Sequence, residues 1–187
     1  MKIVLCGPSH SGKSCLREGL KQAIRQIPNA PYPYFITACP DGEGSWFAPT
    51  FKANPVLAEK LKKGYKSKFT WKFARKAAED VQNTSLSFNL IDVGGVIDDK
   101  NRLIMGHATH AVILSRDLNL VTEWSQFCGE LNLKIIAILK SDLEAVEDQL
   151  EAETPILQGS IHGLERGKDV SQHFMVQKLA QVLIKLS

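Results

Sequence analysis

The chain has 187 residues, a length that suits one compact domain. Hydrophobic residues make up 44 % and charged residues 23 % of the sequence, and these values exclude a disordered or fibrous chain. The net charge of +3 does not by itself indicate a partner. The four cysteines form no CxxC pair, no apolar run is long enough to cross a bilayer, and no signal peptide is recognisable. The sequence therefore predicts a cytoplasmic protein with reduced thiols, and neither a membrane nor duplex nucleic acid is expected as a partner.

Apolar, strand-like runs alternate with helical patterns along the chain, and this alternation predicts a parallel sheet covered by helices. Strands are expected at residues 2–6, 34–39, 86–92, 110–115 and 134–139. Helices are expected at residues 13–27, 98–106, 119–131, 142–150 and 171–186. We therefore predict a single α/β domain over residues 1–187, in which a central five-stranded parallel sheet lies between two layers of helices.

One segment differs in charge from the rest of the chain. Between Phe51 and Asp80 the sequence has nine basic and three acidic residues, a net charge of +6. Two helices are expected here, with a break near Gly64. Positive charge beside a cleft attracts a polyanionic substrate, so we interpret residues 51–82 as a basic helical insertion that acts as a lid or binds an acceptor. A solvated helical face is the alternative.

A phosphate-binding motif follows the first predicted strand. The stretch Gly7–Ser14 matches GxxxxGK(S/T) at every required position and leads into an amphipathic helix. Glycines let the backbone approach a phosphate closely, and the helix that follows adds its free N–H groups and positive dipole end. Lys13 is expected to reach the β- and γ-phosphates, and the Ser14 hydroxyl to bind Mg²⁺. The predicted nucleotide-binding residues of this loop are Gly7, Pro8, Ser9, His10, Ser11, Gly12, Lys13, Ser14 and Cys15.

A second motif stands at the end of the third predicted strand. Asp92 occupies the position usual for the carboxylate that holds the water shell of Mg²⁺. Asp92-Val93-Gly94-Gly95 also fits DxxG, in which the N–H of Gly95 can contact a γ-phosphate. A simple turn is the alternative. With the phosphate loop, the motif predicts ATP and Mg²⁺ as cofactors and Ser14 and Asp92 as the metal-binding residues.

Two classes of enzyme use such a loop, a GTPase-like switch and a small-molecule kinase. The stretch Leu139–Asp142 stands where a guanine-reading NKxD would lie, but leucine replaces the asparagine. Ser141-Asp142-Leu143-Glu144 can instead be a capping box that begins a helix. Val96 stands where a Ras-type enzyme has the glutamine that orients the attacking water. These departures favour a nucleotide-kinase-like protein.

A kinase also needs groups that handle the acceptor and the transferring phosphate. Asp41 and Glu43, in the acidic turn after the second predicted strand, are candidates for positioning an acceptor. Arg116, or a basic residue of the segment 60–76, is a candidate for stabilising the developing charge. A plain acidic turn and a surface ion pair are the alternatives. In the loop Gly159–Gly167, we expect His162 and Arg166 to flank an adenine, with an exposed loop as the alternative.

The other histidines give no sign of a metal site. His107, His110 and His173 show no metal-ligand spacing with cysteine or acidic residues, so the sequence predicts no zinc site.

Three stretches together resemble a known family: Gly7–Ser14, Tyr34–Phe47 and Asp92–Gly95. They are similar to the AAA-type P-loop domain found fused to, or beside, a CRISPR type III ring nuclease in cyanobacteria and other bacteria. The resemblance covers most of the chain, and CPDGEGSWF, residues 39–47, is its specific part. It implies nucleotide binding through Gly7–Ser14 and a ring nuclease as partner, an enzyme that degrades the cyclic oligoadenylate messenger of antiviral defence.

The chain departs from ring-forming AAA machines, because it has no recognisable second-region arginine finger and is too short for their helical lid domain. A monomeric or homodimeric kinase-like protein is therefore expected. The preferred reaction is phosphoryl transfer from Mg·ATP to a nucleotide-like acceptor, with Lys13, Asp41, Glu43 and Arg116 as catalytic residues. The alternatives are a regulatory NTPase that controls a partner protein and a module that keeps the nucleotide as a structural ligand.

Overall fold

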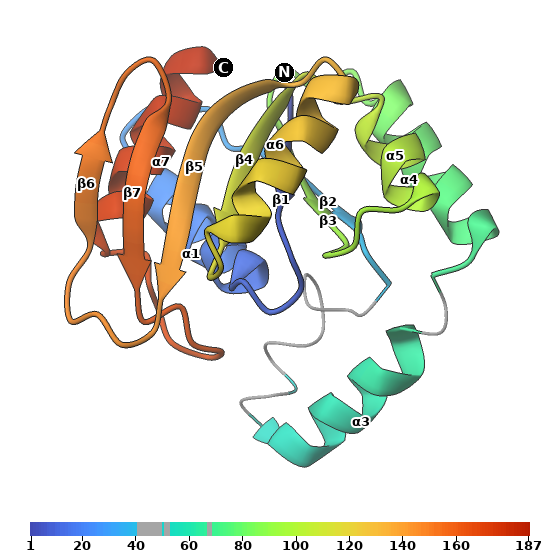
Figure 1. Ribbon diagram of the computed structural model, residues 1–187, viewed down its shortest axis with the longest axis horizontal. Helices are drawn as coiled ribbons and strands as arrows, with labels where there is room; N and C mark the ends of the chain where they lie inside the picture. The colour runs from blue at the N-terminus through green and yellow to red at the C-terminus, as the bar shows by residue number, and fades with distance from the viewer. Residues whose placement is uncertain (41–49, 51–52, 67–68) are drawn as a thin grey trace.

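The computed structural model describes residues 1–40, 50, 53–66 and 69–187 (Figure 1). Its helices and strands are, in chain order, β1 (Lys2–Cys6), α1 (Lys13–Arg25), β2 (Tyr34–Ala38), α3 (Pro55–Lys66), α4 (Trp71–Asn83), β3 (Asn89–Val93), α5 (Asp99–Met105), β4 (His110–Ser115), α6 (Asn119–Glu130), β5 (Lys134–Asp142), β6 (Gln149–Ala152), β7 (Leu157–His162) and α7 (Phe174–Leu186).

The strands form one mixed sheet of seven, in the order β2-β3-β1-β4-β5-β7-β6 (Figure 1). All neighbouring strands are parallel except β6 and β7, which are antiparallel. The prediction of a five-stranded, fully parallel sheet is therefore wrong, because β6 and β7 extend it beyond β5. The parallel strands all end at one edge of the sheet, where ligands of open α/β sheets bind. In register, Leu5 of β1 pairs with Asp92 of β3 on one side and with Val112 of β4 on the other.

The helix predicted at residues 142–150 does not form. Ser141 and Asp142 belong to β5, and β6 begins at Gln149. Instead of a capping box, a tight turn follows, in which Asp142 Oδ1 accepts hydrogen bonds from the backbone N–H groups of Glu144, at 3.1 Å, and Ala145, at 3.2 Å. An aspartate that bonds the backbone two or three residues ahead favours a turn over a continuing helix or strand.

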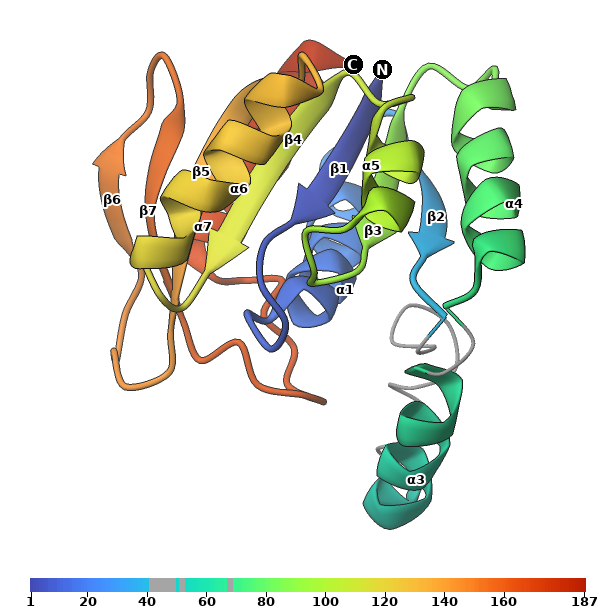
Figure 2. The same ribbon diagram turned by 45° about the vertical axis from the view of Figure 1, so that its right-hand side comes forward.

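Helices cover both faces of the sheet, which confirms the predicted three-layer α/β architecture (Figure 2). On one face, apolar side chains of α1 and α7, among them Leu20 and Leu183, pack against β1, β4 and β5. On the other face, α4, α5 and α6 contribute a second core that includes Met105 and Phe127. Among the described residues, no helix combines the length and the hydrophobicity needed to cross a bilayer.

The basic segment 51–82 divides into two structurally different helices. α4 belongs to the layer that covers the sheet, because its buried alanines and Val81 pack against it. α3 stands apart from the sheet, on the side where the parallel strands end (Figures 1 and 2). Asn54 begins α3 by accepting a hydrogen bond from the N–H of Leu57, at 3.0 Å, with a proline in the first helical position. Since α3 continues through Gly64, the predicted break is misplaced and lies between α3 and α4.

All four cysteines lie among the described residues, and the structure joins none of them in a disulfide. Cys6 and Cys128 are buried between β1 and α6, with their Sγ atoms 3.8 Å apart. The hydrogen bond with Cys128 and burial together raise the pKa of the Cys6 thiol well above its ordinary value. Cys6 therefore stays protonated and contributes to the core as a small apolar side chain.

Candidate phosphate-binding site

The loop between β1 and α1 has the backbone geometry of an anion site. Gly7, His10 and Gly12 have positive φ angles of 130°, 64° and 90°. Right- and left-handed residues in succession turn their amide N–H groups inward and make a concavity that binds anions. α1 begins at Lys13, so the free N–H groups of its first turn border the same loop.

Two glycines allow close backbone contacts around this loop. A Cβ on Gly7 would lie 1.9 Å from the carbonyl oxygen of Leu114 in β4, and a Cβ on Gly95 would lie 2.4 Å from the backbone nitrogen of Ser9. The N–H of Ser9 also donates to the carbonyl of Gly95, at 3.1 Å. The structure thus brings the segment that follows Asp92 against the phosphate loop.

The ammonium group of Lys13 lies inside the loop. Its Nζ donates hydrogen bonds to the carbonyl oxygens of Gly7 and Pro8, both at 2.8 Å, and the residue is 8 % exposed. Ser11 Oγ donates to the same Pro8 carbonyl at 2.8 Å, which stiffens the loop. A phosphate oxygen would be a stronger acceptor for this ammonium than a neutral carbonyl is.

Asp92 reaches the same edge of the sheet from the strand next to β1. It lies near the end of β3, opposite Leu5, and is 4 % exposed. Its Oδ2 lies 3.6 Å from Nη1 of Arg17. Ser14, in the first turn of α1, is half-buried. The fold therefore places one predicted metal-binding residue on α1, which follows the phosphate loop, and the other on β3, the strand paired with β1.

Arg17 is a site residue that sequence reasoning missed. It is fully buried in α1, and its Nη1 donates to Thr37 Oγ1 of β2 at 3.1 Å, while Nη2 bonds Glu18 Oε1 at 2.8 Å. A buried guanidinium is stable only with several acceptors, so Arg17 links Asp92 to the end of β2. The signal for it was present, because Arg17 falls on the apolar stripe of the predicted helix, beside Leu16 and Leu20.

The same cluster holds Glu18 in its ionised form. Burial by itself would raise the pKa of Glu18, but hydrogen bonds from Lys21 and Arg17 outweigh it, and the net pKa is lowered. Glu18 therefore carries a negative charge beside Arg17 near neutral pH.

Asn101, in α5, is a second residue that sequence reasoning missed. It is fully buried, and its Nδ2 donates to the carbonyl oxygens of Gly94, at 3.2 Å, and Val96, at 2.7 Å. These two bonds hold the segment after Asp92 in place, and with it the contact between Gly95 and Ser9. A lone asparagine in a short amphipathic helix gave no sequence signal for this role.

The remaining predicted residues lie in different places. Asp41 and Glu43 fall outside the described residues. Arg116 is exposed directly after β4, at the same edge as the phosphate loop. Arg166 is half-buried in the segment 163–172. This segment passes beside the phosphate loop, since a Cβ on Gly12 would lie 3.0 Å from Cβ of Leu164.

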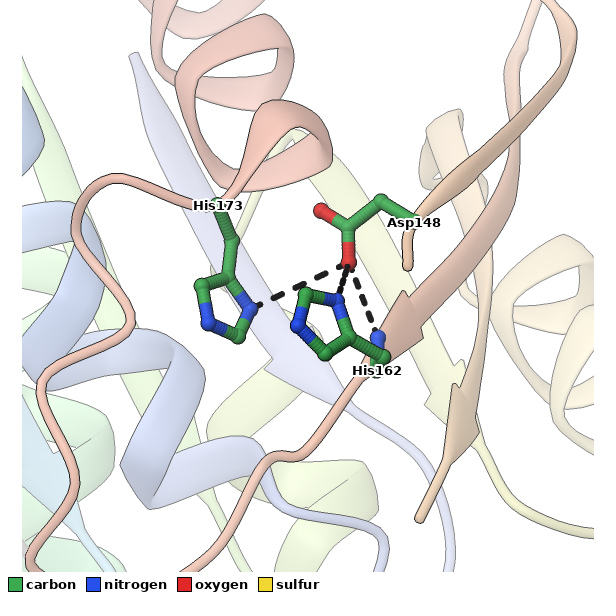
Figure 3. Close-up of side chains that lie close together, drawn as sticks. All are labelled: Asp148, His162 and His173. Atoms are coloured by element: carbon green, nitrogen blue, oxygen red, sulfur yellow. Dashed lines mark hydrogen bonds and ion pairs between the residues drawn. The ribbon is translucent and has the colours of Figure 1, made fainter. Parts of the chain in front are cut away.

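His162, predicted to flank an adenine, ends β7 and takes part in a side-chain cluster (Figure 3). Its ring stacks on His173 with ring centroids 4.0 Å apart and an interplanar angle of 3°. Its Nδ1 lies 2.6 Å from Oδ1 of Asp148. The sequence gave no metal-ligand spacing for these histidines, because the three residues are far apart along the chain and meet only through the fold.

Comparison with known proteins identifies the fold. No protein-family model matches the sequence, and no curated protein matches it. The septum site-determining protein MinD of Pyrococcus horikoshii, complexed with Mg-ADP, has a similar structure, with 15 % identity, a TM-score of 0.60 and coverage of 98 % of this chain and 93 % of that chain. A putative plasmid partition protein of Borrelia burgdorferi, bound to AMPPNP, aligns with 12 % identity, a TM-score of 0.59 and coverage of 99 % and 97 %. The chain therefore has the α/β fold of P-loop NTPases.

Proposed function

We propose that the protein binds Mg·ATP in the loop 7–14 and cleaves its γ-phosphoryl bond. The observation that carries this proposal is the contact of three parts at one edge of the sheet: the curled loop, the Lys13 ammonium inside it, and the segment that follows Asp92. Two observations favour adenine over guanine. Leu139 replaces the asparagine of a guanine-reading motif, and the two proteins of similar structure were solved with ADP and with an ATP analogue.

The residues beside the loop fit a magnesium ion, because the Ser14 hydroxyl and the Asp92 carboxylate supply the oxygen donors that Mg²⁺ prefers. Bound Mg²⁺ would neutralise charge on the β- and γ-phosphates. Lys13 would exchange the Gly7 and Pro8 carbonyls for phosphate oxygens. Arg17 is a positioning residue here, since its guanidinium lies beside the Asp92 carboxylate and holds it in place.

For the acceptor, we propose a nucleotide-like molecule, so that the reaction is a phosphoryl transfer. Two observations support this proposal. β2, tied to Asp92 through Thr37 and Arg17, directly precedes the stretch of sequence that contains Asp41 and Glu43. The basic helix α3 stands on the side of the sheet where the parallel strands end. The resemblance to the ring-nuclease-associated domain makes short oligoadenylates candidate acceptors, in a role beside type III antiviral defence.

A regulatory NTPase, in which water is the acceptor, is the second candidate. The names of the two proteins of similar structure, a septum site-determining protein and a putative plasmid partition protein, favour it. The exposed side chains of Val96 and Ile97 follow the contact between Gly95 and Ser9, so they would offer a partner protein an apolar surface near the proposed position of the γ-phosphate.

Calorimetric titration of ATP with and without Mg²⁺ tests the binding site. We expect Lys13→Ala to weaken ATP binding by about 10- to 100-fold, because charged hydrogen bonds to phosphate are lost. Lys76→Ala is the matched control, since that lysine is exposed in α4 and pairs with Asp80. Equal affinities for the wild type and Lys13→Ala, or no ATP binding by the wild type, would refute the proposal.

Product analysis separates the two reactions. γ-Labelled ATP is incubated with a panel of nucleosides, nucleotides and short oligoadenylates, and the label is followed. Label in an acceptor supports phosphoryl transfer, whereas label only in free phosphate supports the regulatory NTPase. Asp92→Asn, which removes the proposed charge at the metal, should abolish both products.

A further inference from the structure

Three side chains from distant parts of the chain converge beside the start of α7 (Figure 3). Asp148 lies between β5 and β6, His162 ends β7, and His173 is the N-cap residue of α7. Each can offer one ligand atom, and these three atoms all lie within 4.8 Å of one another. Figure 3 shows that both rings turn Nδ1 toward the carboxylate.

The carboxylate of Asp148 is fixed by backbone groups. Its side chain is 1 % exposed. Oδ2 accepts a hydrogen bond from the N–H of Met175, in the first turn of α7, at 2.7 Å, and Oδ1 accepts one from the N–H of His162 at 2.9 Å. Because the backbone holds it, Oδ1 stays directed at the two imidazole rings. A fixed, hydrogen-bonded carboxylate is the kind of oxygen ligand found in built metal sites.

His173 is the unexplained member of the cluster. Its Nδ1 is buried and has no hydrogen-bond partner in the part of the chain that the structure describes, although it lies 3.8 Å from Asp148 Oδ1. A buried polar atom without a partner is costly and calls for a ligand or a role.

We propose that Asp148 Oδ1, His162 Nδ1 and His173 Nδ1 bind one divalent transition-metal ion of the zinc class, with water in the fourth position. Two imidazoles and one carboxylate make a donor set that suits Zn²⁺ and its first-row neighbours, whereas Mg²⁺ prefers oxygen alone. Both rings are partly exposed, at 27 % for the side chain of His162 and 19 % for that of His173, so the cluster lies close to the protein surface.

Binding changes the cluster in a defined way. An ion about 2.0–2.1 Å from each donor needs its ligand atoms roughly 3.3 Å apart. The 2.6 Å contact between His162 Nδ1 and Asp148 therefore opens, the 3.8 Å separation from His173 closes, and the rings leave their parallel stack. Binding through Nδ1 requires the tautomer of each imidazole whose proton is on Nε2.

The ion would link the two ends of the segment 163–172, because this segment begins directly after His162 and ends directly before His173. Leu164 of this segment lies beside Gly12, and Val170 beside Gly19 of α1. A metal at its base therefore fixes a segment that borders the phosphate loop. The site is separate from the proposed Mg²⁺ site, because it uses none of the residues around Lys13 and Asp92.

Cobalt titration of the metal-free protein tests the site, since Co²⁺ reports its ligands through its visible spectrum. We expect one equivalent of Co²⁺ to bind, to give the spectrum of a four-coordinate nitrogen–oxygen site, and to be displaced by Zn²⁺ but not by Mg²⁺. His173→Gln should weaken binding by at least about 100-fold, beyond the usual effect of losing an outer-shell partner. His173→Gln should fold, because Nδ1 of His173 makes no hydrogen bond to the described residues that the substitution would remove.

His107→Gln is the matched control, because His107 precedes β4 at the opposite edge of the sheet and should leave the cobalt spectrum unchanged. Lys13→Ala should also keep the site, which separates this proposal from that of nucleotide binding. The proposal is overturned if the wild type binds no stoichiometric Co²⁺, if His173→Gln binds it equally well, or if the spectrum shows thiolate ligands.

Discussion

The phosphate loop lies at the same end of α1 as the charged cluster formed by Arg17, Glu18, Thr37 and Asp92, but different interactions hold the two in place. Main-chain contacts fix the loop, with Gly7 against Leu114 and Gly95 against Ser9. Side chains fix the cluster, with Arg17 between Asp92 and Thr37. Adding one carbon atom to a glycine of the loop should therefore destabilise the protein. The cluster should instead be destabilised by the removal of a charge at nearly constant side-chain volume.

The largest effect is expected at Gly7. Gly7→Ala puts a Cβ about 1.9 Å from a carbonyl oxygen of β4 and forces a side chain onto a φ of +130°. We expect it to lower the free energy of unfolding by more than about 3 kcal/mol, measured by urea denaturation.

Gly129→Ala is the control for this substitution, since Gly129 is in α6 and a Cβ added there would meet no atom within 4 Å. There alanine should stabilise the helix by up to about 1 kcal/mol. A Gly7→Ala protein as stable as the wild type would show that main-chain contact does not fix the loop.

A smaller effect is expected at Arg17. Arg17→Met keeps most of the side-chain volume but leaves the Asp92 carboxylate without this cation, which should cost about 3 kcal/mol of folding free energy. Arg17→Met should also weaken ATP binding, and it should do so more strongly in the presence of Mg²⁺ than in its absence. Arg17→Lys should restore part of both quantities, measured by denaturation and calorimetry.

Arg25→Met is the matched control on the same helix. Arg25 is exposed and its guanidinium lies 4.7 Å from the ring centroid of Tyr32, so its loss should cost less than about 1 kcal/mol. Similar losses for the two variants would contradict a special role for Arg17.

The smallest effect is expected at Glu18, which is partly exposed. Glu18→Gln should cost less than about 1 kcal/mol near neutral pH. Because folding lowers the pKa of Glu18, its contribution to stability is present above the ordinary pKa of 4.5 and is lost as the pH falls through the lower folded value. The difference between wild type and variant should therefore shrink in acid, as followed by thermal unfolding. A constant difference would argue against an ionic contribution.

The regions that the sequence predicted best are those in which neighbouring residues carry the signal. The phosphate loop, β1, β4 and α1 follow from short motifs and regular hydrophobic spacing, and the structure places them as expected. The prediction failed at residues 142–150, where a helical pattern is overridden by the turn at Asp142 and by the pairing of β6 with β7. Strand pairing depends on a partner that a local pattern does not reveal.

The sequence by itself determined the fold class and the phosphate loop, since a strand, a glycine-rich turn and a helix in direct succession leave the backbone few conformations. Only the tertiary structure decided that Arg17 meets Asp92 and that Asp148, His162 and His173 converge. The physical reason is that these residues are separated along the chain. Whether a buried charge finds its partner, or a set of ligands forms, depends on which elements are neighbours in space. The order of the strands in the sheet, rather than local sequence spacing, determines those neighbours.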